Sequence, residues 1–211
     1  MARLYCVHRP WAFAAVCLLL LLSVHCGSKP MMIPAKQNTP EAAYAKGKRL
    51  LDKGSYAEAQ AAFEQSRVLD PAYAPAYEGL SRAAFALGNR NEAIRAIQMA
   101  KIKDANYVPV WIFTGMIYLS AKRYGDALAE FQEALQRDPD RLWATETYLQ
   151  LGKVHEQTDQ MALAHEAYMN ALTLDPLLAE ARAGALRART ALGPGFVARL
   201  QFEGKQIELL P

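Results

Sequence analysis

Side chains that could carry out chemistry are few and widely spaced in this sequence. Ser81 lies in the segment Gly79–Ala83, whose Gly-x-Ser spacing suggests a nucleophilic serine, but such a serine must sit on a sharp turn between a strand and a helix. The surrounding apolar pattern places Ser81 in the middle of a helix instead. His155 and His165 lie ten residues apart on different predicted helices, whereas two histidines that bind zinc from one helix are spaced i and i+4. The sequence therefore predicts no catalytic residue, no metal site and no cofactor.

The charge balance argues against a nucleic-acid-binding protein. The chain has 211 residues and carries 24 Lys and Arg against 21 Asp and Glu. Two of the basic residues, Arg3 and Arg9, lie in an N-terminal segment without acidic residues, so the rest of the chain is close to neutral. Because nucleic-acid binders usually carry a basic face, we expect no nucleic-acid partner.

Cysteine is confined to the N-terminus, at Cys6, Cys17 and Cys26. The remaining chain therefore offers neither a disulfide framework nor a cysteine-ligated metal site. A short basic region precedes an apolar run over 11–24. This run has the length of a signal-peptide core, about 7–15 residues, and is shorter than the roughly 20 residues that cross a bilayer.

The run followed by Cys26 resembles a bacterial lipoprotein signal peptide, in which the cysteine becomes the first mature residue and is lipidated on its thiol. The resemblance implies a signal peptide over 1–25, a lipidated Cys26 and a flexible tether over 26–39. Two or more lipid chains would hold the protein stably on a membrane. His25 and Ser23 depart from the small residue and the leucine that this family prefers at those two positions. An ordinary cleaved signal peptide and an uncleaved membrane anchor are the alternatives.

A repeated motif organises the rest of the chain. An Asp-Pro pair, or Asp-Ala in one copy, ends at residues 71, 105, 139 and 176, so the spacings are 34, 34 and 37. Small residues recur at one position of each predicted first helix, and a bulky residue flanked by small ones recurs in each second helix. The first-helix residues are Gly47, Ser81, Gly115 and Gly152, and the bulky residues are Phe63, Ile97, Phe131 and Tyr168. Small side chains let two antiparallel helices approach closely, and the bulky residue fills the space toward the next unit.

The period and these positions resemble the tetratricopeptide repeat, a helix–turn–helix unit. The resemblance implies an all-α fold, a right-handed α-solenoid of four such repeats plus a C-terminal capping helix. The expected repeats cover 40–73, 74–107, 108–141 and 145–178, the capping helix covers 179–192, and the tail covers 193–211. For the tail, three alternatives stay open: no fixed structure, packing in the groove of the array, or continuation into a further region. We expect the turn residues Gly54, Gly88 and Gly125 to adopt positive φ.

Repeat arrays bind partners through the concave groove lined by their first helices. By analogy with the family, the residues expected to bind a partner are Tyr44, Lys48, Leu51, Glu78, Arg82, Phe85, Ile112, Met116, Leu119, Leu149 and Lys153. They combine an apolar middle with a ladder of basic residues, Lys48, Arg82 and Lys153. Family members that bind chaperone tails clamp a carboxylate with lysine and asparagine at the fifth and ninth positions of the repeat. In this chain, the fifth position of the repeat holds neither lysine nor asparagine in any unit, so chaperone-tail binding is disfavoured.

An apolar groove with charged edges suits an extended or helical segment of a protein partner. The alternatives are a groove filled by the chain's own tail or by a second copy in a homo-oligomer, and ordinary scattered exposure. The leading hypothesis is a non-catalytic scaffold in a bacterial cell-envelope complex, lipid-anchored at the periplasmic face of the outer membrane. Similar lipoproteins assist outer-membrane protein assembly, pilus biogenesis or the recruitment of cell-wall enzymes, and the sequence does not choose among these. A protein that self-assembles at the membrane is the second hypothesis.

Overall fold

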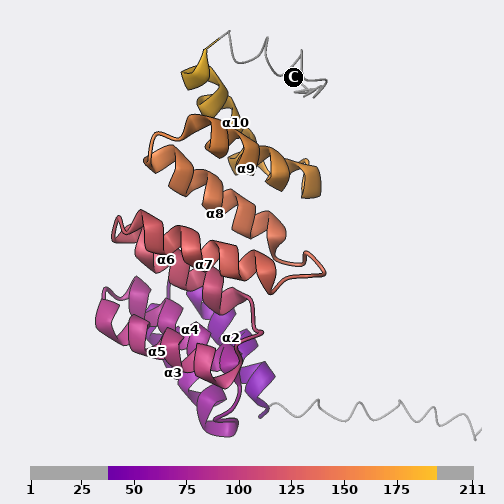
Figure 1. Ribbon diagram of the computed structural model, residues 1–211. Coiled ribbons are helices and arrows are strands. Elements are labelled where there is room, and N and C mark those ends of the chain that lie inside the picture. The colour runs from indigo at the N-terminus through magenta and orange to yellow at the C-terminus, as the bar shows by residue number, and fades with distance from the viewer. Residues whose placement is uncertain (1–37, 194–211) are drawn as a thin grey trace, which may run out of the picture. The chain divides into compact units, whose positions relative to one another are not determined.

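The computed structural model describes residues 38–193, which form nine α-helices and no strand. The helices are α2 (Pro40–Asp52), α3 (Tyr56–Leu69), α4 (Ala74–Ala86), α5 (Arg90–Lys103), α6 (Pro109–Ser120), α7 (Tyr124–Gln136), α8 (Ala144–Gln157), α9 (Met161–Leu174) and α10 (Ala179–Leu192). Four hairpins, α2–α3, α4–α5, α6–α7 and α8–α9, follow one another in chain order and precede α10 (Figure 1). The expected all-α solenoid of helix–turn–helix repeats is confirmed. Predictions on the signal peptide, on Cys26, on most of the tether and on residues 194–211 lie outside the described residues.

Proline marks the start of three of the first helices. Pro40, Pro75 and Pro109 occupy the first or second position of α2, α4 and α6, where the missing N–H costs nothing because it has no partner within the helix. The Oγ1 atom of Thr39 also accepts a hydrogen bond of 3.2 Å from the backbone N–H of Ala42, which caps α2.

The recurring aspartate closes the loop between successive hairpins. The carboxylates of Asp70, Asp104 and Asp175 each accept a backbone N–H from two residues further on, at 2.8 Å, 2.8 Å and 3.0 Å. This is the local turn that aspartate favours. Asp138 precedes the loop that carries the three-residue insertion, and its carboxylate accepts the N–H groups of Leu142 and Trp143 instead, at 2.9 Å and 2.7 Å. The aspartate at this place in the repeat therefore also closes the longer loop, by accepting N–H groups four and five residues further along the chain.

Each hairpin turns through one residue with positive φ. We number the units from residues 40, 74, 108 and 145, so that position 15 is Gly54, Gly88, Lys122 and Asp159. Their φ angles are 78°, 82°, 58° and 58°. The prediction for Gly125 is wrong: the left-handed residue of the third turn is Lys122, because position 15 carries this conformation and Gly125 lies in the first turn of α7. A lysine and an aspartate accept this conformation at a cost of about 1–2 kcal/mol each.

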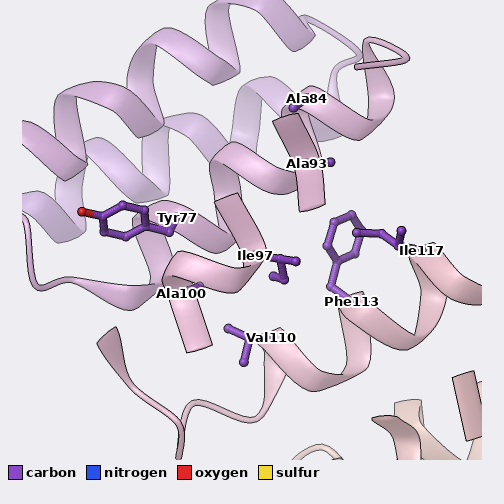
Figure 2. Packing of buried hydrophobic residues seen from close by; sticks show 8 residues of the cluster. All are labelled: Tyr77, Ala84, Ala93, Ile97, Ala100, Val110, Phe113 and Ile117. Carbon is purple, nitrogen blue, oxygen red and sulfur yellow. The ribbon is translucent and has the colours of Figure 1, made fainter. Parts of the chain in front are cut away.

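One core cluster shows how a hairpin packs on the next (Figure 2). Tyr77 and Ala84 come from α4, while Ala93 and Ala100 from α5 let the two helices of the hairpin approach closely. Ile97 projects from α5 toward the following helix α6. The cluster is completed there by Val110, Phe113 and Ile117. Each second helix is therefore packed between its own first helix and the next one.

The bulky residue at position 24 fits between position 8 of its own unit and position 6 of the next. Phe63 is fully buried, and a Cβ atom added at Gly47 or Gly79 would lie 2.5 Å or 2.4 Å from its ring. Where position 6 is instead the large Phe113, position 24 of the preceding unit is the smaller Ile97. The sizes at the two positions are therefore complementary at the first two junctions.

The junction between the fourth unit and α10 repeats the packing of the junction between the first two units. Tyr168 is 1 % exposed, and its ring lies between Gly152 of α8 and Gly184 of α10. A Cβ atom at either glycine would lie 2.5 Å from the ring, which is closer than real side chains approach. α10 therefore packs on α9 through the same backbone-to-ring contact that joins α4 to α3.

Successive first helices also contact one another along the stack. α2 contacts α4, α4 contacts α6, α6 contacts α8, and α8 contacts α10, whereas the backbones of successive second helices stay apart and only side chains bridge them. First helices therefore lie on the inside of the curve, and their solvent-facing side forms what we call the inner face. None of the helices in the described part of the chain combines the length and apolar character needed to cross a membrane.

Candidate partner-binding face

The side chains that suggested chemistry have structural partners. Ser81 is fully buried in α4, and its hydroxyl donates a hydrogen bond of 2.7 Å to the carbonyl of Ala93. The Nδ1 atom of His155 lies 2.8 Å from the Oε1 atom of Gln160, and His165 is buried in α9. Across residues 38–193, no group of three His, Cys, Asp or Glu side chains is arranged to hold a metal ion.

The structure separates the residues expected to bind a partner into three sets. Lys48 is exposed, and the half-buried residues are Tyr44, Leu51, Arg82, Phe85, Met116, Leu119 and Lys153. The buried residues are Glu78, Ile112 and Leu149, with 2 %, 2 % and 3 % exposure. Ile112 and Leu149 belong to core clusters between hairpins and offer no surface to a partner. The role of the accessible residues in binding stays a prediction.

A polar cluster links the first three units on the inner face. The Tyr44 hydroxyl of α2 donates to the Oε2 atom of Glu78 in α4 at 3.3 Å, and lies 3.5 Å from the Tyr107 hydroxyl just before α6. Burial, followed by the charge of Glu78, raises the pKa of Tyr44 above its usual range and that of Tyr107 to about 12. Both tyrosines therefore remain protonated donors at neutral pH.

Arg82 is held in place from two sides. Its Nε atom donates to the Oε1 atom of Glu78, and its guanidinium carbon lies 4.4 Å from the centre of the Phe113 ring. The Arg82 side chain is 33 % exposed. No buried side-chain nitrogen or oxygen of the described residues lacks a hydrogen-bond partner, so the two Nη groups, which make no bond to those residues, face solvent. Arg82 is a positioned donor whose charge is already compensated by Glu78.

An apolar strip adjoins Arg82. The Phe85 and Phe113 rings meet edge to face, with centroids 5.9 Å apart. Phe85 and Met116 pack partly buried against the cluster of Figure 2, and Leu119 packs against the next cluster. These three side chains keep part of their surface in solvent. Units two and three therefore present one positioned arginine and three partly exposed apolar side chains.

Ion pairs to α10 occupy the inner face of the fourth unit. Lys153 Nζ lies 2.8 Å from Glu180 Oε1. Arg187 donates through Nε and Nη2 to the two carboxylate oxygens of Glu156, at 2.6 Å and 2.9 Å. In the ladder of basic residues, Arg82 and Lys153 form ion pairs, and Lys48 is the one of the three without an ion-pair partner in the described chain. Glu78, four residues before Arg82 on the same helix, was the sequence signal for the first of these pairs.

Acid is expected to destabilise this C-terminal end in two steps. Burial, then the charge of Arg189, lowers the pKa of His165 below 6.5. Because the unfolded chain binds that proton more readily, stability is full above pH 6.5 and falls as the pH drops below it. The hydrogen bond from Arg187 lowers the pKa of Glu156 below 4.5, so a second loss follows below that pH. Urea unfolding from pH 7.5 to about pH 3 should show both steps, and His165→Gln should remove only the upper one. An unchanged upper step in that variant would contradict this assignment.

A depression lies between the second helices α3 and α5, on the side of the stack opposite the inner face. It has a volume of about 720 Å³, and we call it the outer cleft. Its lining includes Gln60, Glu64, Arg67, Glu92, Arg95 and Met99. Gln60 Nε2 donates to Glu92 Oε1 across it at 2.8 Å. Sequence analysis missed this cleft because its residues alternate with buried ones on two separate helices and form no linear motif.

Comparison with known proteins supports the repeat assignment. Three models described as tetratricopeptide repeat match residues 50–112, 108–141 and 145–176. Among solved structures, one from the functional characterisation of Pseudomonas aeruginosa pilF has a TM-score of 0.68 and 20% identity, and covers 79% of this chain and 74% of that one. A thermophilic TPR protein of Thermus thermophilus has a TM-score of 0.63 and 22% identity, with 72% and 81% covered.

A further solved structure contains a bound partner. The TPR2B domain of yeast Sti1 in a complex with pHsp70 has a TM-score of 0.51 and 26% identity, and covers 56% of this chain and 97% of that one. A search of curated proteins found no match. The three repeat matches lie between residues 50 and 176 and together cover more than half of the chain. The chain belongs to the tetratricopeptide repeat family, whose members generally serve as non-catalytic protein-interaction modules.

Proposed function

We propose that this protein is a non-catalytic scaffold that binds a segment of a protein partner on the inner face of its second and third units. One observation carries the proposal: Phe85, Met116 and Leu119 form an accessible apolar strip beside the positioned guanidinium of Arg82. Burial of such a strip stabilises a complex by about 25 cal/mol per Å² of apolar area, before the costs of association.

The charges of this face favour an uncharged, apolar segment. Arg82 is compensated by Glu78, and at the C-terminal end Lys153 and Glu156 are compensated by residues of α10. An acidic segment would therefore gain little attraction on entering. The free Nη groups of Arg82 can still donate to a main-chain carbonyl oxygen, which accepts hydrogen bonds without a full charge. The partner segment is accordingly one that places apolar side chains on the strip and a carbonyl on Arg82.

The test uses random peptides displayed on phage, selected on the full-length protein held in detergent micelles. Apolar, uncharged peptides should be enriched. Met116→Glu should weaken their binding about tenfold or more, because an unpaired carboxylate is costly against an apolar ligand and tenfold corresponds to about 1.4 kcal/mol. Met99→Glu in the outer cleft is the matched control and should leave binding unchanged. Equal losses in both variants, or enrichment of acidic peptides that bind regardless of Met116, would refute the proposed face.

We also propose that a lipid on Cys26 tethers the array to a membrane of the bacterial cell envelope, with the periplasmic face of the outer membrane favoured. The support is in the sequence alone: the apolar run ends at Cys26, and a spacer with two prolines, Pro30 and Pro34, leads to α2. About 13 residues of extended chain reach roughly 45 Å, which would let the array meet partners near the surface.

Replacement of Cys26 separates a lipid anchor from an apolar one. Cys26→Ala should move the protein from the membrane fraction to the soluble fraction and abolish incorporation of labelled palmitate. Cys17→Ala, within the leucine-rich run, is the matched control and should change neither result. If Cys26→Ala stays in the membrane fraction, the chain is held by the uncleaved apolar run, and the lipid anchor is ruled out.

A further inference from the structure

One side of α2 is covered by no other helix of the described chain. In the later first helices, position 10 faces the preceding second helix and is buried as Ala83, Ile117 and Val154. α2 contacts only α3 and α4, and its position 10 is the exposed Arg49. Positions 3 and 6 on the same side are the small residues Ala42 and Ala45. This side of α2 closes the array at its N-terminal end, and we call it the end face.

Three cations form a row on the end face. Lys46, Arg49 and Lys53 follow one another at spacings of three and four residues, which places them on one side of the helix. All three side chains are exposed, and none forms an ion pair with a described residue. The two carboxylates of α2, Glu41 and Asp52, lie roughly 100° around the helix axis from the centre of this row. The end face is therefore a small, open and basic surface.

The place of this surface in the chain favours a lipid bilayer as its occupant. α2 begins where the proposed tether from Cys26 ends, so its first turn stays within roughly 45 Å of the membrane. A contact made by a tethered protein forms at a high effective concentration, so a weak attraction is sufficient. Each basic residue near an anionic bilayer strengthens the attraction about fivefold. An acidic protein would meet the same cations, but the chain does not hold such a partner nearby.

We propose that the end face of α2 docks on the anionic headgroups of the membrane that holds the N-terminus. This inference rests on the proposed membrane tether and adds an orientation to it. The contacts between first helices run in order from α2 to α10, so these two helices lie at opposite ends of the stack. Docking through α2 keeps the inner face of the second and third units clear of the bilayer and accessible to a partner.

Lysine labelling tests the docking on the full-length protein. The protein is reconstituted through its own N-terminus into vesicles of phosphatidylcholine alone or of phosphatidylcholine mixed with phosphatidylglycerol, and is treated with a membrane-impermeant amine reagent. In the mixed vesicles, Lys46 and Lys53 should be labelled about threefold or more slowly than in the neutral vesicles. Lys122, an exposed lysine of the third unit, should be labelled equally in both. High salt should abolish the difference, because it screens the attraction.

Arg49→Glu provides a matched variant. It should remove most of the protection of Lys46 and Lys53 in the mixed vesicles, because it replaces the middle cation of the row by an anion. Arg95→Glu is the control, since Arg95 is an exposed arginine of α5 without an ion pair among the described residues, and the substitution changes the net charge equally. It should leave the protection unchanged.

Flotation of the same vesicles separates the docking from the anchor. Protein that floats with neutral vesicles is held by its N-terminus, and equal labelling of Lys46 in both kinds of vesicle would then overturn the docking alone. Flotation with the mixed vesicles only, with Lys46 protected, would support the docking and refute the anchor. Protection of Lys122 as strong as that of Lys46, equal effects of the two variants, or protection of Lys46 that is the same in neutral vesicles and insensitive to salt would each overturn the proposal. The last result would mean that another part of the chain or a second copy covers the end face.

Discussion

Gly184→Val is expected to detach α10 from the array. A Cβ atom at Gly184 would lie 2.5 Å from the Tyr168 ring. The ring cannot retreat, because on its other side a Cβ atom at Gly152 would be equally close. Overpacking of this kind typically costs about 1–3 kcal/mol, and the ion pairs of Glu180 and Arg187 to α8 are lost with the helix.

The detachment of α10 can be read locally. Amide hydrogen exchange across 182–192 should accelerate toward the rates of an unfolded segment, while α4 to α7 keep their protection. Ala183→Val is the control, because Ala183 is the neighbouring exposed residue and the substitution adds the same β-branched side chain to the helix. If both variants exchange alike, helix propensity and not the contact with Tyr168 is responsible.

Phe63→Ala should produce the largest loss of stability in the first half of the array. Phe63 is fully buried, and its ring fills the space between Gly47 and Gly79, which have no side chain that could expand into a cavity. Truncation of a buried phenylalanine costs about 3–5 kcal/mol. Because each hairpin is stabilised mainly by its neighbours, α2 and α3 should unfold at a lower denaturant concentration than the rest.

Phe85→Ala is the matched control for this experiment. Phe85 is half-buried on the inner face and meets Phe113 edge to face, so its truncation should cost clearly less than that of Phe63, because less apolar surface is lost from the core. Urea unfolding followed by circular dichroism measures both variants. If Phe63→Ala is as mild as Phe85→Ala, the ring of Phe63 is not the wedge that joins the first two hairpins.

Sequence alone predicted the hairpins because helix packing is dictated by side-chain size at fixed positions. Position 24 must hold a bulky side chain and position 8 a small one, and Phe63 with Gly47 or Phe131 with Gly115 satisfies this within one unit. The partner of Phe63 at position 6 of the next unit, Gly79, was not recognised. This pair crosses the junction between units, and only the structure shows that Ile97 is small because it faces Phe113.

The candidate site was predicted less completely. Positions on the inner face followed from the repeat register, but which of them are accessible depends on how closely neighbouring hairpins pack. Ile112 and Leu149 are buried for that reason. The charge of the face also depends on pairs that join different units, as Lys153 does with Glu180. Such pairs have no fixed spacing in the sequence.

The loop at Ala105, which has alanine where the other copies have proline, is bonded to the third unit. The carbonyl oxygen of Ala105 accepts hydrogen bonds from Trp111 Nε1 at 2.9 Å and from Arg137 Nη1 at 3.3 Å. The Trp111 ring in turn lies 4.0 Å from Lys101 Nζ and 4.4 Å from the guanidinium carbon of Arg137. Cation–π contacts of this kind contribute about 0.5–1 kcal/mol each. The second and third units are thus joined where the loop lacks its proline.

Each second helix packs on the next first helix, and successive first helices also touch, but the backbones of successive second helices stay apart, so the outer side of the stack is the less tightly held. The second helices are separate, and side-chain pairs such as Gln60–Glu92 and Lys101–Glu130 bridge the gaps between them. Side-chain links adapt to a change in helix spacing more readily than direct helix contacts do, so the contacts between first helices act as the hinge. The curvature of the array is therefore expected to change by separation of its second helices, which would adjust the inner face to partner segments of different thickness.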